Sequence, residues 1–351
     1  FAKKAMPTYH ALPISAISQE TFQAVLLTFE VPTALKSAFD FQAGQYVSLE
    51  ATINGEAVRR SYSICTAPHE GRLSVGIKKI EGGLFSSYAK DQLTVGQSLM
   101  VGIPEGRFVY VPSAKPQQFM AVAAGSGITP IMALLKTALE AHPENHFYLV
   151  YGNKTPQETM FYSELQALLS TYPKRLHIDW VFSKSNEPDA VFGRIDTALL
   201  HRALKNAPQA PQHFYFCGPE ALIDLTKNVL TAKAFDPSTI HFELFQSSHS
   251  LTQIEEASQE GLLRVLNDDV VTDLSIVPDK TILDIALQNR LDVPYSCQGG
   301  VCSSCIARVT EGSARMLTNQ ILTDDEIEEG LVLTCQAVPT STRISVDYDD
   351  V

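Results

Sequence analysis

The sequence predicts a multidomain protein with an antiparallel β-barrel, an α/β domain built on a parallel sheet, and a small α+β domain. Its 351 residues are enough for two or three hydrophobic cores. Short alternating strands fill residues 8–112, and apolar strands alternate with helical patterns over residues 117–246. A polar stretch without periodicity follows. We therefore assign domains to residues 1–112, 113–246 and 259–351, with a linker at residues 247–258.

The composition is that of a globular protein in a reducing compartment. Hydrophobic residues make up 45% of the chain and charged residues 19%, and no run approaches the ~18 apolar residues of a membrane span. The first residues lack the apolar core of a signal peptide. Four of the six cysteines share one pattern, and Cys65 and Cys217 are far apart, so a disulfide framework is not indicated. We expect a cytoplasmic protein without a membrane span.

The net charge of −12 is concentrated in the last predicted domain. Residues 259–351 contain 16 acidic and 6 basic residues, whereas the rest of the chain contains 23 and 21. Such an acidic surface disfavours binding to nucleic acid. It favours docking to a basic face of a protein partner, although acidic residues also serve solubility alone.

The barrel is predicted from strands such as Thr21–Glu30, Gln45–Ile53 and Leu73–Ile80, which are separated by turn residues. It contains a motif that suits a flat, phosphorylated ligand. Arg60 offers a fork for a phosphate, and Tyr62 lies on the same strand face. The Tyr62 ring can stack on a flat cofactor, while the Ser63 hydroxyl can reach a ring nitrogen.

A second barrel motif consists of glycines that open a predicted helix. The segment Gly82-Gly83-Leu84-Phe85-Ser86 would bring backbone N–H groups close to an anion. Either barrel motif alone is also compatible with an ordinary strand or turn.

Strand and helix patterns alternate in the second domain, which predicts a parallel sheet covered on both faces. The predicted strands are Gln118–Ala123, Phe147–Tyr151, Ile178–Phe182, Phe214–Cys217 and His241–Phe245. The predicted helices are Pro130–Ala141, Met160–Ser170, Asp196–Leu204 and Glu220–Thr231.

Two turns at the carboxyl ends of these strands predict a dinucleotide site. The first is Gly125-Ser126-Gly127-Ile128-Thr129-Pro130, where small residues allow a tight turn and Pro130 stands near the helix start. It lacks the full Gly-x-Gly-x-x-Gly fingerprint. The second is Cys217-Gly218-Pro219, at the edge where open α/β sheets bind ligands. Cys217 is either a small buried residue or a contact for the nicotinamide.

The third domain has a hairpin pattern across Asn267-Asp268-Asp269, a helix at Thr281–Asn289 and then a cysteine loop. Cys297, Cys302 and Cys305 follow a Cys-x4-Cys-x2-Cys spacing, and Cys335 stands 30 positions further on. This is the plant-type pattern for a [2Fe–2S] cluster, and thiolates are its preferred ligands. The alternative is a zinc site, which normally uses two short cysteine pairs instead.

Taken in order, these motifs resemble the ferredoxin–NADP⁺ reductase superfamily. The chain is similar to oxygenase reductases with a fused C-terminal ferredoxin, and in particular to reductases of the phenylacetyl-CoA epoxidase type. The shared segments include Glu81-Gly-Gly, Tyr151-Gly-Asn153, His241-x-Glu243-x-Phe245 and Leu333-x-Cys335-Gln-Ala337. The resemblance covers essentially the whole chain and implies a β-grasp fold for the third domain.

The resemblance also implies roles for individual residues. Ser63 would approach the flavin N5 atom, Cys217 the nicotinamide, and Phe245 one flavin face, so that these three would form the catalytic set. The cofactor-binding set would be Arg60, Tyr62, Ser63, Ile64, Gly82, Gly83, Leu84, Phe85, Ser86, Gly125, Ser126, Gly127, Thr129, Pro130, Asn153, Ser183, Lys184, Arg194, Cys217, Gly218 and Pro219. The metal ligands would be Cys297, Cys302, Cys305 and Cys335.

Charge near the third strand favours NADPH, with NADH as the alternative. Ser183 and Lys184 follow this strand, and Arg194 comes soon after. Hydroxyls and cations suit a 2′-phosphate, whereas the ribose of NAD suits an acidic residue. Glu187 and Asp189 lie nearby and are the counter-evidence.

The implied function is an enzyme that passes electrons from NADPH through FAD to a [2Fe–2S] cluster and on to an oxygenase. The resemblance favours the phenylacetyl-CoA epoxidase as that partner, and we expect the reductase to be monomeric. Alternatives are the reductase of another oxygenase, such as an acyl-CoA desaturase or an alkane or aromatic-ring hydroxylase, and a non-catalytic iron–sulfur redox sensor.

Overall fold

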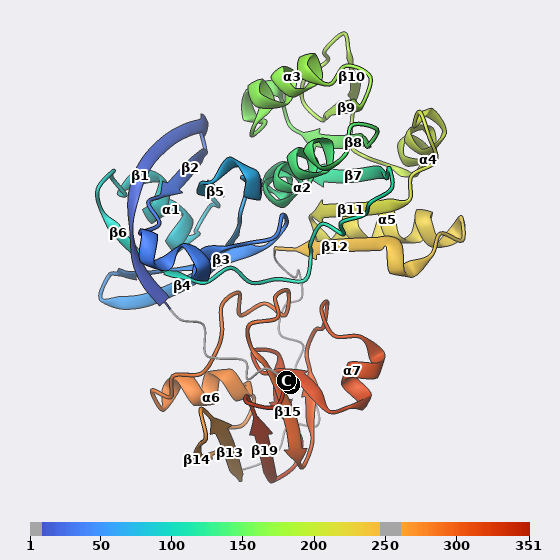
Figure 1. Ribbon diagram of the computed structural model, residues 1–351. Coiled ribbons are helices and arrows are strands. Elements are labelled where there is room, and N and C mark those ends of the chain that lie inside the picture. Colours follow the sequence, from blue (N-terminus) through green and yellow to red (C-terminus); the bar gives the residue numbers. More distant parts are fainter. Residues whose placement is uncertain (1–8, 246–260) are drawn as a thin grey trace. The chain divides into compact units, whose positions relative to one another are not determined.

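The computed structural model describes residues 9–245 and 261–351 (Figure 1). Residues 10–245 form one compact unit and residues 261–351 belong to a second. The predicted linker at residues 247–258 lies outside the described residues. The multidomain architecture with a barrel, a parallel α/β domain and an α+β domain is confirmed.

The first unit opens with a barrel-like antiparallel sheet. Within the described residues its strand order is β4-β3-β6-β1-β2-β5. An isolated bridge between Ile64 and Val75 joins the end of β4 to β5. The strands are β1 (Tyr9–Thr21), β2 (Ala24–Phe29), β3 (Tyr46–Ile53), β4 (Glu56–Ser63), β5 (Leu73–Lys78) and β6 (Ser98–Gly102); the helices are η1 (Thr33–Phe39), η2 (Pro68–Glu70) and α1 (Leu84–Asp91).

The predicted strand Thr21–Glu30 differs from the structure at its start. β1 ends at Thr21 and β2 begins at Ala24, because Phe22 and Gln23 form a two-residue hairpin turn. Inside the barrel, alternate residues such as Leu27 and Leu49 are fully buried. The short period-2 pattern therefore identified the barrel strands, but not this turn, which lacks glycine, asparagine and aspartate.

The rest of the first unit is a parallel sheet in the order β10-β9-β8-β7-β11-β12. The strands are β7 (Gln118–Ala124), β8 (His146–Asn153), β9 (Leu176–Phe182), β10 (Ala190–Phe192), β11 (His213–Gly218) and β12 (Ile240–Leu244). The strand order reverses between β7 and β11, which is the switch point at which such sheets bind ligands. The predicted dinucleotide turns follow these two strands.

Helices cover both faces of this sheet. α2 (Ile128–Ala141) and α3 (Tyr162–Thr171) pack on the face that carries Phe119, Leu149 and Tyr151. α4 (Thr197–Asn206) and α5 (Glu220–Ala232) pack on the opposite face, against Met120 and Phe216. The short 3-10 helices are η3 (Gly125–Gly127), η4 (Pro156–Glu158) and η5 (Pro237–Thr239).

The barrel and the parallel-sheet domain pack tightly within the first unit. A Cβ on Gly76 of β5 would lie 2.7 Å from Thr129 Cγ2 of α2, so the Thr129 side chain packs directly on the backbone of β5 at this glycine. Lys136 on α2 forms ion pairs with Glu70 of the barrel at 2.8 Å and with Glu164 on α3 at 3.1 Å. Residues from both domains can therefore build one site.

The second unit is a mixed sheet in the order β14-β13-β19-β15-β17. β13 pairs with β19 in parallel, whereas β13–β14, β15–β17 and β15–β19 are antiparallel. The apolar face of α6 packs into the core of this unit, as expected for a β-grasp domain. The elements are β13 (Leu262–Asn267), β14 (Val270–Ser275), α6 (Ile282–Gln288), β15 (Ile306–Glu311), β16 (Ala314–Met316), α7 (Asp324–Glu328), β17 (Leu331–Leu333), β18 (Ala337–Pro339) and β19 (Arg343–Asp347).

The hairpin predicted at Asn267-Asp268-Asp269 joins β13 to β14. Asp268 and Asp269 have φ of 51° and 61°, a conformation that aspartate tolerates better than most residues. The Asp349 carboxylate accepts hydrogen bonds from both of their backbone N–H groups, at 2.9 and 2.8 Å.

In the described part of the chain, no helix is long and apolar enough to cross a membrane.

Candidate functional site

A buried hydrogen bond joins the barrel to the parallel sheet. Ser63, the last residue of β4, donates through Oγ to Oε2 of Glu243 on β12, at 3.1 Å. Both residues are buried. Glu243 pairs in register with Cys217 at the end of β11, so the three side chains belong to one place at the carboxyl edge of the sheet.

Burial keeps the two titratable members of this group neutral. It raises the pKa of Glu243 to about 8, although the hydrogen bond from Ser63 acts in the opposite direction. Burial, followed by the charge of Glu243, raises the pKa of the Cys217 thiol well above its ordinary value. Cys217 is therefore a buried thiol rather than a reactive thiolate.

The two predicted dinucleotide turns touch each other at this edge. A Cβ on Gly127 would lie 2.1 Å from the carbonyl oxygen of Cys217, so only glycine fits there. Gly125 has φ of 56°, which places it in the left-handed region. Thr129 donates through Oγ1 to the Ser126 carbonyl at 2.9 Å and holds the turn closed. A tight turn that leads into a helix is the kind of site that binds a phosphate.

The remaining predicted residues of these turns are Pro130, Gly218 and Pro219, and each lies in or just before a helix start. Pro130 is in the first turn of α2, and Pro219 is the residue that precedes α5. Gly218 packs closely, because a Cβ there would lie 3.0 Å from Leu222 Cδ2. The structure therefore brings the sequence-predicted residues of the β7 and β11 turns together.

The barrel motif places Tyr62 beside α1. The Tyr62 and Phe85 rings have centroids 5.5 Å apart, and burial raises the pKa of the Tyr62 phenol. The Phe85 side chain is itself buried, so it supports Tyr62, and only its backbone is left to contact a phosphate. Arg60 is exposed and donates through Nη1 to the carbonyl of Arg59 at 2.6 Å. Ile64 is a core residue.

The glycines before α1 form a tight turn. Gly82 has φ of 72°, and Gly83 donates its N–H to the Ile80 carbonyl at 2.9 Å. The Ser86 hydroxyl accepts a hydrogen bond from the Ile80 N–H at 3.1 Å. A Cβ on Gly83 would lie 2.5 Å from Ser86 Oγ. The turn therefore needs Gly83, and the first N–H groups of α1 have no partner within the helix.

The residues predicted to select the nucleotide lie side by side. Phe182 and Phe192 pair in register, and the Gly193 N–H donates to the Phe182 carbonyl at 2.8 Å. Ser183 and Arg194 are therefore neighbours at the carboxyl edge of β9 and β10. Ser183 also donates its N–H to the carbonyl of Asn153 at 3.0 Å. Lys184 and Arg194 are both exposed.

Two residues were missed as site candidates. Glu243 belongs to the segment His241-x-Glu243-x-Phe245, and its signal was a single carboxylate in a strand that has no other acidic residue. Lys78 ends β5, and its Nζ lies 3.9 Å from where a Cβ on Gly125 would stand. Burial lowers the pKa of Lys78. No sequence pattern placed this lysine of the barrel beside the first turn of the parallel-sheet domain.

Phe245 directly follows β12 and is the last residue that the structure describes in the first unit. Its side chain is 36% exposed. It lies two residues beyond Glu243 in the sequence. Its contact with a flavin remains a prediction.

The four predicted metal ligands converge in the second unit. Cys297, Cys302 and Cys305 lie between α6 and β15, and Cys335 follows β17. Hydrogen bonds from Cys302 and Cys335 hold the pKa of Cys297 well below its ordinary value. The bond to Cys297, followed by burial, raises the pKa of Cys302. All six cysteines of the chain lie in described residues, and none of them forms a disulfide there.

Backbone contacts hold the cysteine loop in shape. Gly300 has φ of 71°, and a Cβ there would lie 2.9 Å from Gln336 Cγ. Thr334 donates to the Cys305 carbonyl through both its N–H (3.0 Å) and its Oγ1 (2.9 Å). Gln336 donates through Nε2 to the Gln298 carbonyl at 3.1 Å. Four converging thiols on a glycine-lined loop fit a [2Fe–2S] cluster.

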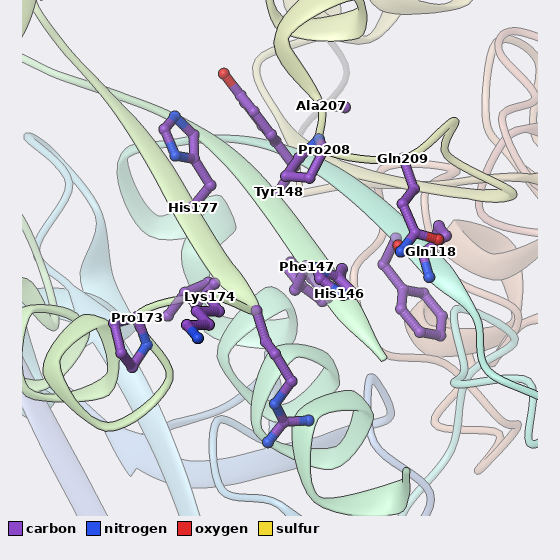
Figure 2. A pocket seen from close by; sticks show the side chains of 13 residues that line it. Gln118, His146, Phe147, Tyr148, Pro173, Lys174, His177, Ala207, Pro208 and Gln209 are labelled. Carbon is purple, nitrogen blue, oxygen red and sulfur yellow. The ribbon is translucent and has the colours of Figure 1, made fainter. Parts of the chain in front are cut away.

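Two further features define the limits of these sites. Among the described residues, no three His, Cys, Asp or Glu side chains are arranged to hold a single metal ion. A pocket at the other edge of the parallel sheet is lined by the first residues of β7, β8 and β9, Gln118, His146 and Leu176 (Figure 2). It contains none of the predicted site residues.

Comparison with known families matches each domain separately. The oxidoreductase FAD-binding domain matches residues 12–110 and the oxidoreductase NAD-binding domain matches residues 121–228. The 2Fe-2S iron-sulfur cluster binding domain matches residues 266–340. These matches define an oxidoreductase that uses FAD, a pyridine nucleotide and a [2Fe–2S] cluster, which confirms the predicted cluster over a zinc site.

Relatives span the whole chain. It is 40% identical over 352 residues to a component of the 1,2-phenylacetyl-CoA epoxidase of Escherichia coli (strain K12), covering 98% of this chain and 99% of that one. It is 31% identical to the ferredoxin reductase component of 3-ketosteroid-9-alpha-monooxygenase of Rhodococcus rhodochrous, covering 96% of each. The structure of phthalate dioxygenase reductase has the same fold, with a TM-score of 0.64, 23% identity and coverage of 98% and 100%.

The chain therefore belongs to the family of oxygenase reductase components that carry a C-terminal 2Fe-2S domain. It is an oxidoreductase of an oxygenase system, as predicted, and the alternative of a non-catalytic redox sensor is wrong.

Proposed function

We propose that this chain is the NADPH-dependent reductase of a phenylacetyl-CoA epoxidase. When bound, FAD accepts one hydride, with its two electrons, from the nucleotide, and the [2Fe–2S] cluster carries single electrons onward to the oxygenase. The observation that carries the proposal is the buried hydrogen bond from Ser63 to Glu243. It ties the FAD-binding domain to the carboxyl edge of the nucleotide-binding sheet, next to Cys217.

The barrel residues of the site hold and orient the flavin. Arg60 and the N–H groups at the start of α1 bind the pyrophosphate. Tyr62, backed by Phe85 at 5.5 Å, covers one face of the ring system. Phe245 covers the other face until the nicotinamide replaces it. With FAD bound, Ser63 would donate its one hydroxyl proton to a flavin ring nitrogen, while the neutral Glu243 carboxyl donates to the Ser63 oxygen.

The parallel-sheet residues hold the nucleotide. The turn at Gly125–Gly127 and the start of α2 bind its pyrophosphate, with the Lys78 ammonium as a counter-charge. Cys217 and Glu243 line the nicotinamide position as neutral, buried groups that exclude water. Asn153 and the residues that start α5 complete the crevice. No residue of this set has to act as a nucleophile, since the redox chemistry belongs to the cofactors.

The exposed cations at the edge of β9 and β10 bind the 2′-phosphate of NADPH. Arg194 presents a fork of donors and Lys184 a second charge, while Ser183 offers a hydroxyl beside them. Glu187 accepts a hydrogen bond from Ser185 at 2.5 Å and is therefore already engaged. This engagement reduces its competition with the phosphate.

Nucleotide choice is tested with Arg194→Ala. Loss of one guanidinium should raise the KM for NADPH about tenfold, which corresponds to ~1.4 kcal/mol, and leave the KM for NADH nearly unchanged. The matched control is Lys174→Ala, which removes an exposed cation at the opposite edge of the same sheet (Figure 2). An unchanged NADPH preference in Arg194→Ala would remove the 2′-phosphate assignment.

The partner is proposed from the relatives and from charge. The relatives that match most of this chain are named as parts of oxygenase systems, and the acidic surface of residues 259–351 suits a basic docking face. We propose the phenylacetyl-CoA epoxidase in particular because a component of that enzyme is 40% identical to this chain. The free cysteines support a cytoplasmic location, and we propose a monomer.

The partner is tested by reconstitution. The purified chain, NADPH, O2 and an epoxidase preparation that lacks its own reductase should convert phenylacetyl-CoA to its epoxide and water, with one product formed per NADPH consumed. The matched control replaces the epoxidase with the oxygenase component of 3-ketosteroid-9-alpha-monooxygenase. NADPH consumption without epoxide, or equal coupling to both oxygenases, would contradict the assignment of this partner.

A further inference from the structure

A buried threonine ties together the last two predicted ligands of the cluster. Cys305 lies directly before β15, and Cys335 comes two residues after the end of β17, with Thr334 between. Thr334 extends the antiparallel ladder of these strands, because its N–H donates to the Cys305 carbonyl at 3.0 Å. Its Oγ1 donates to the same carbonyl at 2.9 Å. The backbone of one ligand is therefore held by the residue that precedes the other.

A tyrosine near the end of the chain reaches this threonine. Tyr348 directly follows β19, and its N–H donates to the Leu266 carbonyl of β13 at 2.9 Å. Its hydroxyl lies 2.9 Å from Thr334 Oγ1. Tyr348 is 3% exposed and Thr334 is fully buried. The tyrosine ring thus belongs to the core of the second unit, while its hydroxyl contacts the segment that leads into Cys335.

The direction of the two hydrogen bonds follows from their chemistry. A carbonyl oxygen can only accept, so the one hydroxyl proton of Thr334 points to Cys305. Tyr348 must then donate to the Thr334 oxygen, and a phenol, with an ordinary pKa of about 10, carries its proton at neutral pH. The two O–H dipoles are therefore aligned head to tail, with their positive ends toward the backbone of Cys305.

We propose that Tyr348 is a positioning residue for the [2Fe–2S] cluster and that its hydroxyl, acting through Thr334, raises the reduction potential of the cluster. Reduction adds one negative charge, and dipoles whose positive ends point toward a ligand stabilise that charge. Aligned hydrogen bonds also strengthen one another in a dry interior. The inference rests on the proposed role of Cys305 and Cys335 as ligands.

The test is the reduction potential of the cluster in Tyr348→Phe, which keeps the ring and removes only the hydroxyl. The full chain, loaded with FAD and the cluster, is poised at a series of potentials, and the reduced cluster is followed by electron paramagnetic resonance. The equilibrium constant for reduction should fall about threefold, which is ~28 mV at ~59 mV per tenfold change. The FAD potential of the same samples should not change, because the FAD-binding domain lies in the first unit.

Further variants separate positioning from packing. Ile344→Val alters a fully buried residue of the same core on β19, and it should lower the urea midpoint without changing the cluster potential. Thr334→Ser keeps the hydroxyl and should retain the native potential. Thr334→Val removes the connection and should lower the potential. Tyr348→Phe added to Thr334→Val should then cause no further shift, because its effect passes through the Thr334 hydroxyl.

A lower cluster potential in Tyr348→Phe, with no added shift in the double variant, supports the inference. An unchanged potential, with a loss of stability like that of Ile344→Val, overturns it. So does a shift that simply adds to that of Thr334→Val.

Cys305→Ser tests the ligand assignment separately. If this variant keeps the native cluster absorbance per chain, Cys305 is not a ligand and the inference fails with that assignment. If the absorbance is lost but Tyr348→Phe leaves the potential unchanged, the ligand assignment stands and only the positioning role of Tyr348 is wrong.

Discussion

At the scale of single residues, Glu243 is the most unusual group in the first unit. A carboxyl buried against Ser63 and Cys217 is held in its neutral form, with a pKa raised to about 8 by burial. A neutral carboxyl can accept and donate hydrogen bonds, and it avoids placing a fixed charge beside the proposed nicotinamide position. The same burial makes the folded state sensitive to pH.

Glu243→Gln should remove that sensitivity. Because the folded-state pKa lies above the ordinary value of 4.5, the folded chain binds more protons between these two pH values than the unfolded chain does. The free energy of unfolding of the native chain should therefore fall as pH rises from 5 to 8, by at most about 1.4 kcal/mol per pH unit. The glutamine variant lacks this contribution. The difference between its free energy of unfolding and that of the native chain should therefore increase with pH, in favour of the variant.

The measurement is urea unfolding at pH 5.5 and 7.5. Unfolding is monitored by the increase in flavin fluorescence as the flavin is released. Glu56→Gln, an exposed change on the neighbouring β4 strand, should show the same pH dependence as the native chain. Parallel curves for the native chain and Glu243→Gln would mean that Glu243 is already ionised, or is hydrated, in the folded protein.

At the scale of elements, the sequence was most informative where a pattern is local. Apolar runs separated by helical periods predicted the parallel strands and their helices within a few residues, and cysteine spacing predicted the loop before β15. The three-residue strand β10 was not predicted. It is held mainly by its pairing with β9, which no local period reveals.

In the candidate site, too, short local motifs could be predicted, whereas contacts between distant segments could not. The glycine turns after β7 and β11 could be predicted because each is a short motif, and the structure confirms that they touch, since Gly127 leaves no room for a Cβ beside Cys217. The contact of Ser63 with Glu243 joins residues 180 positions apart and depends on how two domains pack. Lys78 reaches the Gly125 turn for the same reason. Such contacts follow from tertiary packing, which local patterns do not encode.

At the scale of the whole molecule, the redox sites are divided between two compact units. Residues 10–245 contain the proposed FAD and nucleotide positions, and residues 261–351 contain the four cysteines. Each unit has its own buried core, so damage to the cysteine loop should leave the first unit folded. This division allows the order of electron flow to be tested by disabling one site at a time.

Cys302→Ser should separate two activities of the full chain. Cys302 is buried in the loop beside Cys297, and a serine oxygen is a poorer ligand than a thiolate for iron–sulfur centres. Reduction of a two-electron dye by NADPH needs only the first unit and should stay within about twofold of the native rate. Reduction of cytochrome c, which requires single electrons from the cluster, should fall at least about tenfold. Flavin content and the visible absorbance of the cluster are measured on the same samples. Equal loss of both activities in a folded variant that still contains its FAD would count against the proposed order of electron flow.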